Sequence, residues 1–348
     1  MTAYFVAYAF LFFSIGIGLL TRRLRTAVVA GFLPLIFLVA ARGLVGTDTA
    51  QYISIIRRLW VQGLFAVELE PVFGIITSLL MRWLHDPFTV LVVISVGVGV
   101  LMLFAGLRLE KVPIIFSALV LPYFMLDMTM NGVRYGLAFA LVTLATVFLL
   151  RGKRLLFVLI GAIAALTQIS ALILVAGIWT LLEARLRTFA AVVIMLVAFA
   201  FFFGGYLDDK ASAYAEVQIL SALSGTVPLV LGILMIAALA TIREIRETSI
   251  PQLAVLLAAV FGAFIMTRFS SGGLRVQAII LFLIYLYGAA RIYRLSINVW
   301  RQQLFIVAMI VVAIAGGAFR YKNLNDDKNF GPTPFNPYYF IWNHYGFD

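Results

Sequence analysis

The sequence lacks the residues from which thiol and metal sites are usually built. It contains no cysteine, and its two histidines, His85 and His344, lie far apart in the chain. Disulfides and thiolate sites are therefore excluded, and the histidines show no spacing typical of metal ligands. We predict no metal site and no cofactor.

Charged residues are also scarce. They make up 12% of the chain, whereas 64% of the residues are hydrophobic; soluble domains carry about 25% charged residues. This composition excludes a water-soluble globule. Each membrane span takes about 20 residues, so little of the chain is left for a soluble domain. The sequence predicts a single membrane domain over residues 1–348.

The few charges are mainly basic, with a formal net charge of +11. Lysine and arginine lie mainly in short segments between apolar runs, where they orient helices or meet lipid head groups. We therefore expect membrane lipid as a partner and no nucleic acid.

Apolar runs bounded by charges, glycine or proline predict an all-α polytopic membrane protein with about 12 transmembrane helices. The predicted spans are residues 4–20, 27–41, 87–107, 112–127, 133–150, 155–167, 169–182, 188–205, 226–241, 251–267, 275–291 and 303–319. Residues 155–182 are divided because Thr167, Gln168 and Ser170 interrupt the run and each half is short for a crossing.

The basic clusters at residues 22–25 and 151–154 are predicted to be cytoplasmic, which requires an even number of crossings between them. Residues 42–86 are therefore predicted to form an outer, periplasmic loop with two amphipathic helices, at 49–60 and 71–84. With this topology, 15 of the 26 basic residues and four of the 15 acidic ones are cytoplasmic. Both termini, including the aromatic-rich tail at 320–348, fall outside.

The outer loop begins with a polar segment that contains Arg42, Gly46, Thr47, Asp48 and Tyr52. Glycine loosens the backbone where one helix ends, and Asp48 or Thr47 is placed to cap the next helix. Asp48 is thus either an N-cap or a candidate general base, and Arg42 is either an interfacial anchor or a phosphate contact.

Arg134 stands at the start of a long apolar helix. A positive helix N-terminus together with arginine is a natural binder of phosphate oxygens. The alternatives are that Arg134 snorkels to water or pairs with Asp127.

Arg268 and Arg275 flank a Ser-Ser-Gly-Gly turn predicted on the same side as Arg134. Their guanidinium groups and the turn amides are suited to hold a diphosphate, although such turns are also common between spans.

Two further polar residues have structural alternatives. Glu70 stands where acidic residues stabilise a helix start, and Gln168 can bind a sugar hydroxyl or another helix. The tail aromatics form an interface belt or a sugar platform.

Several short motifs occur in order along most of the chain. They are Arg42-x-x-Val45-Gly46-Thr47-Asp48-x-x-x-Tyr52, Glu70-Pro71-x-Phe73, Asn131-x-x-Arg134-x-Gly136-x-Ala138, Gln168-x-Ser170-Ala171, Arg275 and the aromatic tail. In this order the sequence resembles the EpsG-like branch of the Wzy-type bacterial polysaccharide polymerases. The family pattern usually has histidine where this chain has Gln168, so the resemblance provides no histidine base here.

The resemblance implies a GT-C-like fold and a metal-independent membrane glycosyltransferase of O-antigen or exopolysaccharide biosynthesis. Its expected substrate is an oligosaccharide carried on undecaprenyl diphosphate, at the periplasmic face of the bacterial inner membrane. A polysaccharide co-polymerase that regulates chain length is an expected partner.

In the expected reaction, an acceptor hydroxyl attacks the anomeric carbon of the donor and undecaprenyl diphosphate leaves, with its charge stabilised by arginine. The predicted diphosphate contacts are Arg42, Arg134, Arg268 and Arg275. The predicted catalytic residues are Asp48, as general base, and Arg134. The predicted substrate contacts are Tyr52, Glu70, Asn131 and Gln168.

Two other classes of function compete with this interpretation. A transporter or flippase of lipid-linked oligosaccharide usually has charges in mid-span and internal repeats, and the sequence shows no clear repeat and few such charges. A membrane acyltransferase is expected to show a histidine motif, which neither histidine provides. An O-antigen ligase uses the same donor chemistry and differs in its acceptor.

Overall fold

The computed structural model describes residues 2–63, 70–109, 121–183, 225–270, 272–326 and 338–342. Within these ranges the regular elements are helices, and an isolated antiparallel bridge joins Arg42 to Phe340. Contacts divide the chain into two compact units. The first comprises Met1–Leu172 and Gly317–Asp348, and the second comprises Ile173–Gly316.

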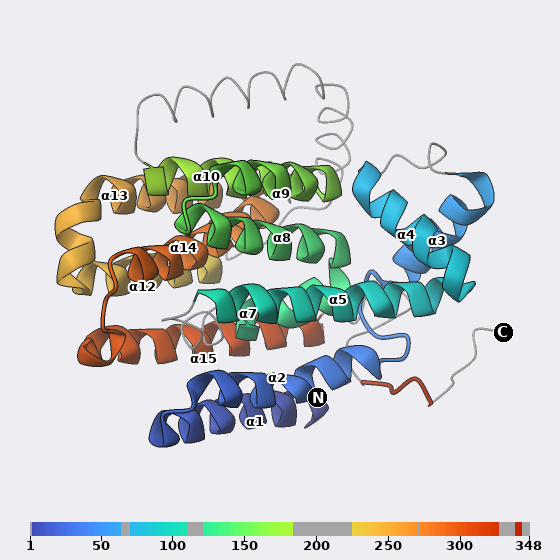
Figure 1. Cartoon of the computed structure of the whole chain (residues 1–348), viewed down its shortest axis with the longest axis horizontal. Coiled ribbons are helices and arrows are strands. Elements are labelled where there is room, and N and C mark those ends of the chain that lie inside the picture. The colour runs from blue at the N-terminus through green and yellow to red at the C-terminus, as the bar shows by residue number, and fades with distance from the viewer. Residues whose placement is uncertain are drawn as a thin grey trace, which may run out of the picture. The chain divides into compact units, whose positions relative to one another are not determined.

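The first unit contains most of the motif residues. Its helices are α1 (Thr2–Thr21), α2 (Leu24–Ala40), α3 (Thr49–Gln62), α4 (Pro71–Leu84), α5 (Pro87–Arg108), α7 (Leu121–Leu126), a π-helix (Asp127–Asn131), α8 (Val133–Leu150) and α9 (Arg154–Thr167). α1 lies beside α2, and α8 packs against both α5 and α9 (Figure 1).

The remaining helices follow the turn after α9. They are α10 (Ala171–Glu183), α12 (Thr226–Thr241), α13 (Arg243–Met266), α14 (Gly272–Arg294), a 3₁₀ turn (Val299–Arg301) and α15 (Gln303–Asp326). In the second unit α12, α13 and α14 pack against one another. α15 crosses the boundary and ends in the first unit.

Helix length and composition make the chain a polytopic α-helical membrane protein. Within the described ranges, six helices are long and apolar enough to cross a bilayer: Thr2–Thr21, Pro87–Arg108, Val133–Leu150, Arg243–Met266, Gly272–Arg294 and Gln303–Arg320. The predicted spans at 27–41, 155–167, 169–182 and 226–241 correspond to shorter apolar helices. The span at 188–205 and most of the span at 112–127 lie outside the described residues. The total of about 12 crossings and the GT-C-like arrangement remain predictions.

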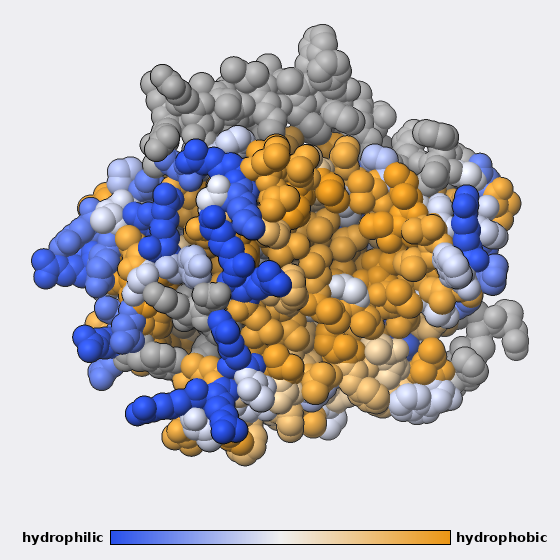
Figure 2. All heavy atoms as spheres, in the orientation of Figure 1, coloured by the Kyte–Doolittle hydropathy of each residue, from blue (hydrophilic) through white to orange (hydrophobic). Residues whose placement is uncertain are grey.

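The outward faces of α5 and α9 are mainly apolar. On α5, Val100 and Phe104 are exposed, and on α9 the exposed side chains include Leu155, Leu159 and Ile163. Figure 2 shows a mainly hydrophobic surface over α5 and α9. Exposed apolar surface on this scale is expected where helices meet lipid chains.

Two helices lie where the sequence predicts the amphipathic pair of the outer loop. α3 buries Tyr52, Ile56 and Leu59 on one side and exposes Arg57 and Arg58 on the other. α4 packs against α3, α5 and α9. The predicted break between residues 155 and 182 is also confirmed, since α9 ends at Thr167 and α10 begins at Ala171.

Candidate active site

The segment between α2 and α3 folds tightly against the π-helix. Gly46 has φ +111°, and a Cβ there would collide with the carbonyl oxygen of Met130. Only glycine combines this conformation with such a close approach. Thr49 Oγ1 then donates to the Val45 carbonyl at 2.7 Å. The close approach of Gly46 thus places the Gly-Thr-Asp segment directly against Met130 of the π-helix.

Asn131, the last residue of the π-helix, binds this segment through its side-chain oxygen. Asn131 Oδ1 accepts from Thr47 Oγ1 at 2.6 Å and from the Asp48 backbone N–H at 2.9 Å. Its Nδ2 donates to Asp127 Oδ1 at 3.3 Å. Because a carboxylate accepts hydrogen bonds and cannot donate them, Asp127 fixes which end of the Asn131 amide faces Asp48. Single-turn π-helices are frequent at functional sites.

Arg134 and Glu70 form an ion pair beside this segment. Arg134, in the first turn of α8, lies 2.8 Å from Glu70 Oε2 through one terminal guanidinium nitrogen. The Arg134 side chain is 21% exposed and the Glu70 side chain 6%. Glu70 Oε1 is also 3.5 Å from the Ile169 backbone N–H, in the turn that follows α9. The pair therefore connects α8, α4 and the turn that contains Gln168.

Tyr52 of α3 lies against the same pair. Its hydroxyl oxygen accepts from the Arg134 backbone N–H at 3.4 Å, and its ring packs on Phe73 at 5.9 Å. Burial raises the pKa of Tyr52, and Arg134 acts in the opposite direction. Tyr52 is thus a neutral hydroxyl at physiological pH, next to the N-terminus of α8.

Both acidic residues that sequence analysis offered as helix caps occupy the N-cap position without capping. Asp48 precedes α3 and Glu70 precedes α4, and neither side chain makes a capping hydrogen bond. The capping alternative is therefore wrong for Asp48, and Glu70 makes no capping hydrogen bond. Glu70 instead pairs with Arg134, and the half-buried Asp48 is bound to Asn131 through its backbone.

The alternative that Arg134 pairs with Asp127 is also wrong. Asp127 forms an ion pair with Arg320 of α15, and the Tyr135 hydroxyl donates to its other oxygen. The Arg320 side chain is 23% exposed and that of Asp127 15%. Sequence analysis did not identify Arg320 as a residue of the site. The available signals were an acidic residue four positions before Asn131 and an arginine that ends the last apolar run.

Arg42 is the most deeply buried charged group of the cluster, with no exposed surface. Its guanidinium donates to the Thr129 carbonyl and to Ser95 Oγ, both at 3.0 Å, and its Nε has no hydrogen-bond partner among the described residues. Burial lowers its pKa to about 10, so the group is still charged at neutral pH. Arg42 is thus not an interfacial anchor, and its role in diphosphate binding remains a prediction.

The aromatic tail is joined to the same segment. Gly43 N–H donates to the Tyr339 carbonyl at 2.7 Å, and Ile341 N–H donates to the Ala41 carbonyl at 2.9 Å. Trp342 stacks on Phe340 with ring centroids 4.5 Å apart and is 61% exposed. The interface belt and the sugar platform both remain predictions for these rings.

The residues that these contacts bring together belong to the short motifs found in the sequence. These motifs lie within the part of the chain that matches a known family. The model of the EpsG family matches residues 25–339, which is most of the chain. The chain belongs to the EpsG family. This family is Wzy-type polymerase-like, and the protein is accordingly a membrane protein of polysaccharide biosynthesis. Comparison with curated proteins and with solved structures gives no match.

Two residues that were predicted to contact the diphosphate of an EpsG-family substrate belong to the second unit. Arg268 and Arg275 are both exposed, and the Arg268 guanidinium lies 4.4 Å from the centre of the Phe264 ring. The turn between them ends where α14 begins, at Gly272. The two arginines are therefore accessible, as the predicted role requires, and that role remains a prediction.

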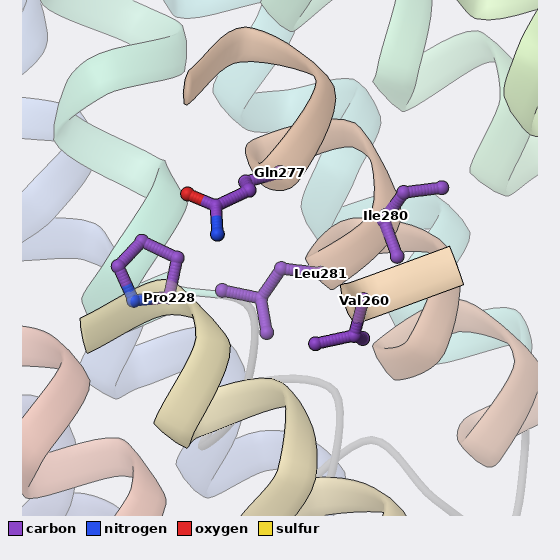
Figure 3. A pocket seen from close by; sticks show the side chains of 5 residues that line it. All are labelled: Pro228, Val260, Gln277, Ile280 and Leu281. Atoms are coloured by element: carbon purple, nitrogen blue, oxygen red, sulfur yellow. The ribbon is translucent and has the colours of Figure 1, made fainter. Parts of the chain in front are cut away.

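The second unit also has a small cavity between α12, α13 and α14. It encloses about 10 Å³, close to the minimum for one water molecule. The residues that line it are Pro228, Val260, Gln277, Ile280 and Leu281 (Figure 3). Gln277 is 4% exposed and donates to the Gly225 carbonyl at 3.0 Å. This cavity is too small for a sugar. Gln277 therefore contributes to the packing of α12, α13 and α14.

Proposed function

We propose that this EpsG-family chain is a Wzy-type polysaccharide polymerase, a membrane glycosyltransferase of the bacterial inner membrane. It transfers a growing glycan from undecaprenyl diphosphate to a lipid-linked acceptor repeat unit at the periplasmic face. A polysaccharide co-polymerase that regulates chain length is the partner we expect. Family membership over residues 25–339 supports the class of function.

The observation that carries the proposed chemistry is the position of Arg134. A cation in the first turn of α8 adds its charge to the positive end of the helix dipole, and the two together favour phosphate oxygens. The departing diphosphate gains negative charge as the glycosidic bond to it breaks. A fixed guanidinium therefore stabilises the transition state more than the ground state.

The other groups of the cluster suit the acceptor side of the reaction. Asp48 and Glu70 are carboxylates next to Arg134 and Asn131, and either has the chemistry of a general base. Tyr52, Asn131 and Gln168 offer a hydroxyl and two amides for sugar hydroxyls. Arg42, Arg268 and Arg275 remain the further diphosphate contacts of the proposal.

A transporter of lipid-linked oligosaccharide is less compatible with this arrangement. Arg134 lies in the first turn of α8 and Glu70 directly precedes α4, so both charges stand at helix ends. Transport sites usually place ionisable groups near the middle of the membrane, between broken helices.

Complementation of a strain deleted for this gene tests the proposal. Wild type is expected to restore long surface polysaccharide, whereas Arg134→Ala, at equal membrane expression, leaves single repeat units on the lipid. Arg57→Ala, an exposed arginine of α3, is the matched control and should restore long chains. Asp48→Asn and Arg275→Ala test the remaining assignments. A deletion that shortens no glycan would contradict the polymerase assignment.

A further inference from the structure

We propose that Glu70 is the general base that takes the proton of the acceptor hydroxyl, and that it becomes free to act when the donor diphosphate binds Arg134. The inference rests on the proposed function and deepens it, because it assigns the base and couples that base to donor binding.

The first argument is the location of the carboxylate. Glu70 stands at the N-cap of α4 and makes no capping bond. Its side chain is 6% exposed, and burial of a carboxylate costs free energy unless a partner compensates it. A local role in helix stability therefore does not explain why this carboxylate is buried.

The second argument is the pairing geometry. One oxygen of Glu70 lies 2.8 Å from Arg134, and the other faces the Ile169 backbone N–H at 3.5 Å. The latter oxygen therefore lies at the turn that contains Gln168. A glutamine amide does not accept a proton at neutral pH. Of Glu70 and Gln168, only Glu70 therefore has the chemistry of a base.

The third argument is the difference in exposure between the partners. The Arg134 side chain is 21% exposed, more than three times the fraction of Glu70. An anion that approaches the site meets the guanidinium before it meets the carboxylate. A diphosphate carries more negative charge than one carboxylate and is bound well by arginine at a helix N-terminus. Donor binding thus competes with Glu70 for Arg134.

This competition releases the carboxylate. When the diphosphate takes Arg134, Glu70 loses its 2.8 Å contact with the guanidinium and can turn toward the acceptor hydroxyl. The base therefore becomes available when the leaving group is in place.

The step then balances as a single displacement. The acceptor oxygen forms a bond to the anomeric carbon, and its proton passes to Glu70. The bond from the anomeric carbon to the phosphate oxygen breaks, and its electron pair stays on the diphosphate, which Arg134 binds. Glu70 later returns its proton to water. Attack from the side opposite the leaving group inverts the configuration at the anomeric carbon.

Asp48 is the competing candidate for the base. It is bound to Asn131 through its backbone N–H at 2.9 Å, a contact that fixes the loop. Glu70 contacts the arginine proposed to bind the leaving group, and this contact is what links the base to the donor. The two assignments make different predictions for Glu70→Gln and Asp48→Asn.

The test uses the full-length protein in proteoliposomes, with lipid-linked repeat units purified from the deletion strain. Two quantities are measured: the single-turnover rate of glycan transfer, and the affinity for undecaprenyl diphosphate. Glu70→Gln should slow transfer by about 10²- to 10⁴-fold, the usual contribution of a general base. The same variant should bind undecaprenyl diphosphate several-fold more tightly, because Arg134 no longer has a charged competitor.

Glu70→Asp, which keeps a carboxylate, should recover part of the transfer rate. Glu247→Gln is the matched control, because Glu247 pairs with Arg243 on an exposed surface, and it should change neither quantity. A merely structural ion pair predicts a different result, namely that Glu70→Gln weakens both transfer and diphosphate binding.

Three results would overturn the inference. Transfer by Glu70→Gln within about threefold of wild type would show that Glu70 is not the base. Weaker diphosphate binding by this variant would make it a structural partner of Arg134. Loss of transfer in Asp48→Asn with normal transfer in Glu70→Gln would assign the base to Asp48. A wild-type protein that transfers no glycan from these units would instead overturn the proposed function itself.

Discussion

Burying a guanidinium among neutral partners costs more free energy than burying it beside a carboxylate. Arg42 donates to a serine hydroxyl and a backbone carbonyl, and neither group compensates a full charge as a carboxylate would. Its lowered pKa reflects this cost. The hydrogen bonds nevertheless join the segment after α2 to α5 and to the π-helix. Arg42 therefore fixes the loop that leads through Asp48 to α3.

Gly46 provides a test of this loop at the scale of one residue. Gly46→Ala should lower the free energy of unfolding by at least ~2 kcal/mol, since alanine disfavours φ +111° and its Cβ meets the Met130 carbonyl. Thermal unfolding of the detergent-solubilised protein measures the change. The control is Gly97→Ala in α5, where a Cβ meets nothing within 4 Å. Equal melting temperatures for the two variants would contradict the assigned strain.

Residue types alone did not reveal which partners the charged groups take. An acidic residue before a helix is compatible with capping, and both Asp48 and Glu70 have that position in the sequence. Their actual contacts depend on Asn131 and Arg134, which come much later in the chain. Sequence analysis named these four residues as candidates and the structure brings them together, but their pairing depends on tertiary structure.

At the scale of elements, the π-helix connects α15 with the segment that precedes α3. Asp127 binds Arg320 of α15, and Asn131 binds both Asp127 and Asp48. Arg320 and Asp127 act through Asn131 as positioning residues. α15 therefore helps to hold the Gly-Thr-Asp segment in place.

A double-mutant cycle tests this connection. Asp127→Asn and Arg320→Gln should each destabilise the protein, and the double variant should lose less than the sum, with a coupling of ~1–3 kcal/mol. The exposed pair Arg243 and Glu247 is the control, and its coupling should be too small to measure. Additive effects of Asp127→Asn and Arg320→Gln would show that the ion pair does not join the two elements.

Elements were predictable where the signal is local. Long apolar runs predicted α5, α8 and α14, and polar residues within an apolar run predicted the break at Gln168. The amphipathic pattern of residues 49–60 and 71–84 predicted α3 and α4. The pairing of the tail with the segment at Gly43 was not predictable, because residues 338–342 and 41–43 carry no pattern that relates one to the other.

At the scale of the whole molecule, the predicted topology places α3 and α4 outside the membrane and residues 151–154 in the cytoplasm. Because the chain has no cysteine, single introduced cysteines report on this without background. In intact cells, a membrane-impermeant maleimide should label Arg57→Cys but should label Lys153→Cys only after lysis; both positions are exposed. The reverse pattern would contradict the positive-inside assignment.

The polymerase assignment is tested most directly by the product balance of the purified, reconstituted protein. Given lipid-linked repeat units alone, it is predicted to form a ladder of longer glycans on the lipid and to release one undecaprenyl diphosphate for each new glycosidic bond. Arg134→Ala should release almost none. Movement of unmodified units across the bilayer with no release of undecaprenyl diphosphate would contradict the account and support a transporter.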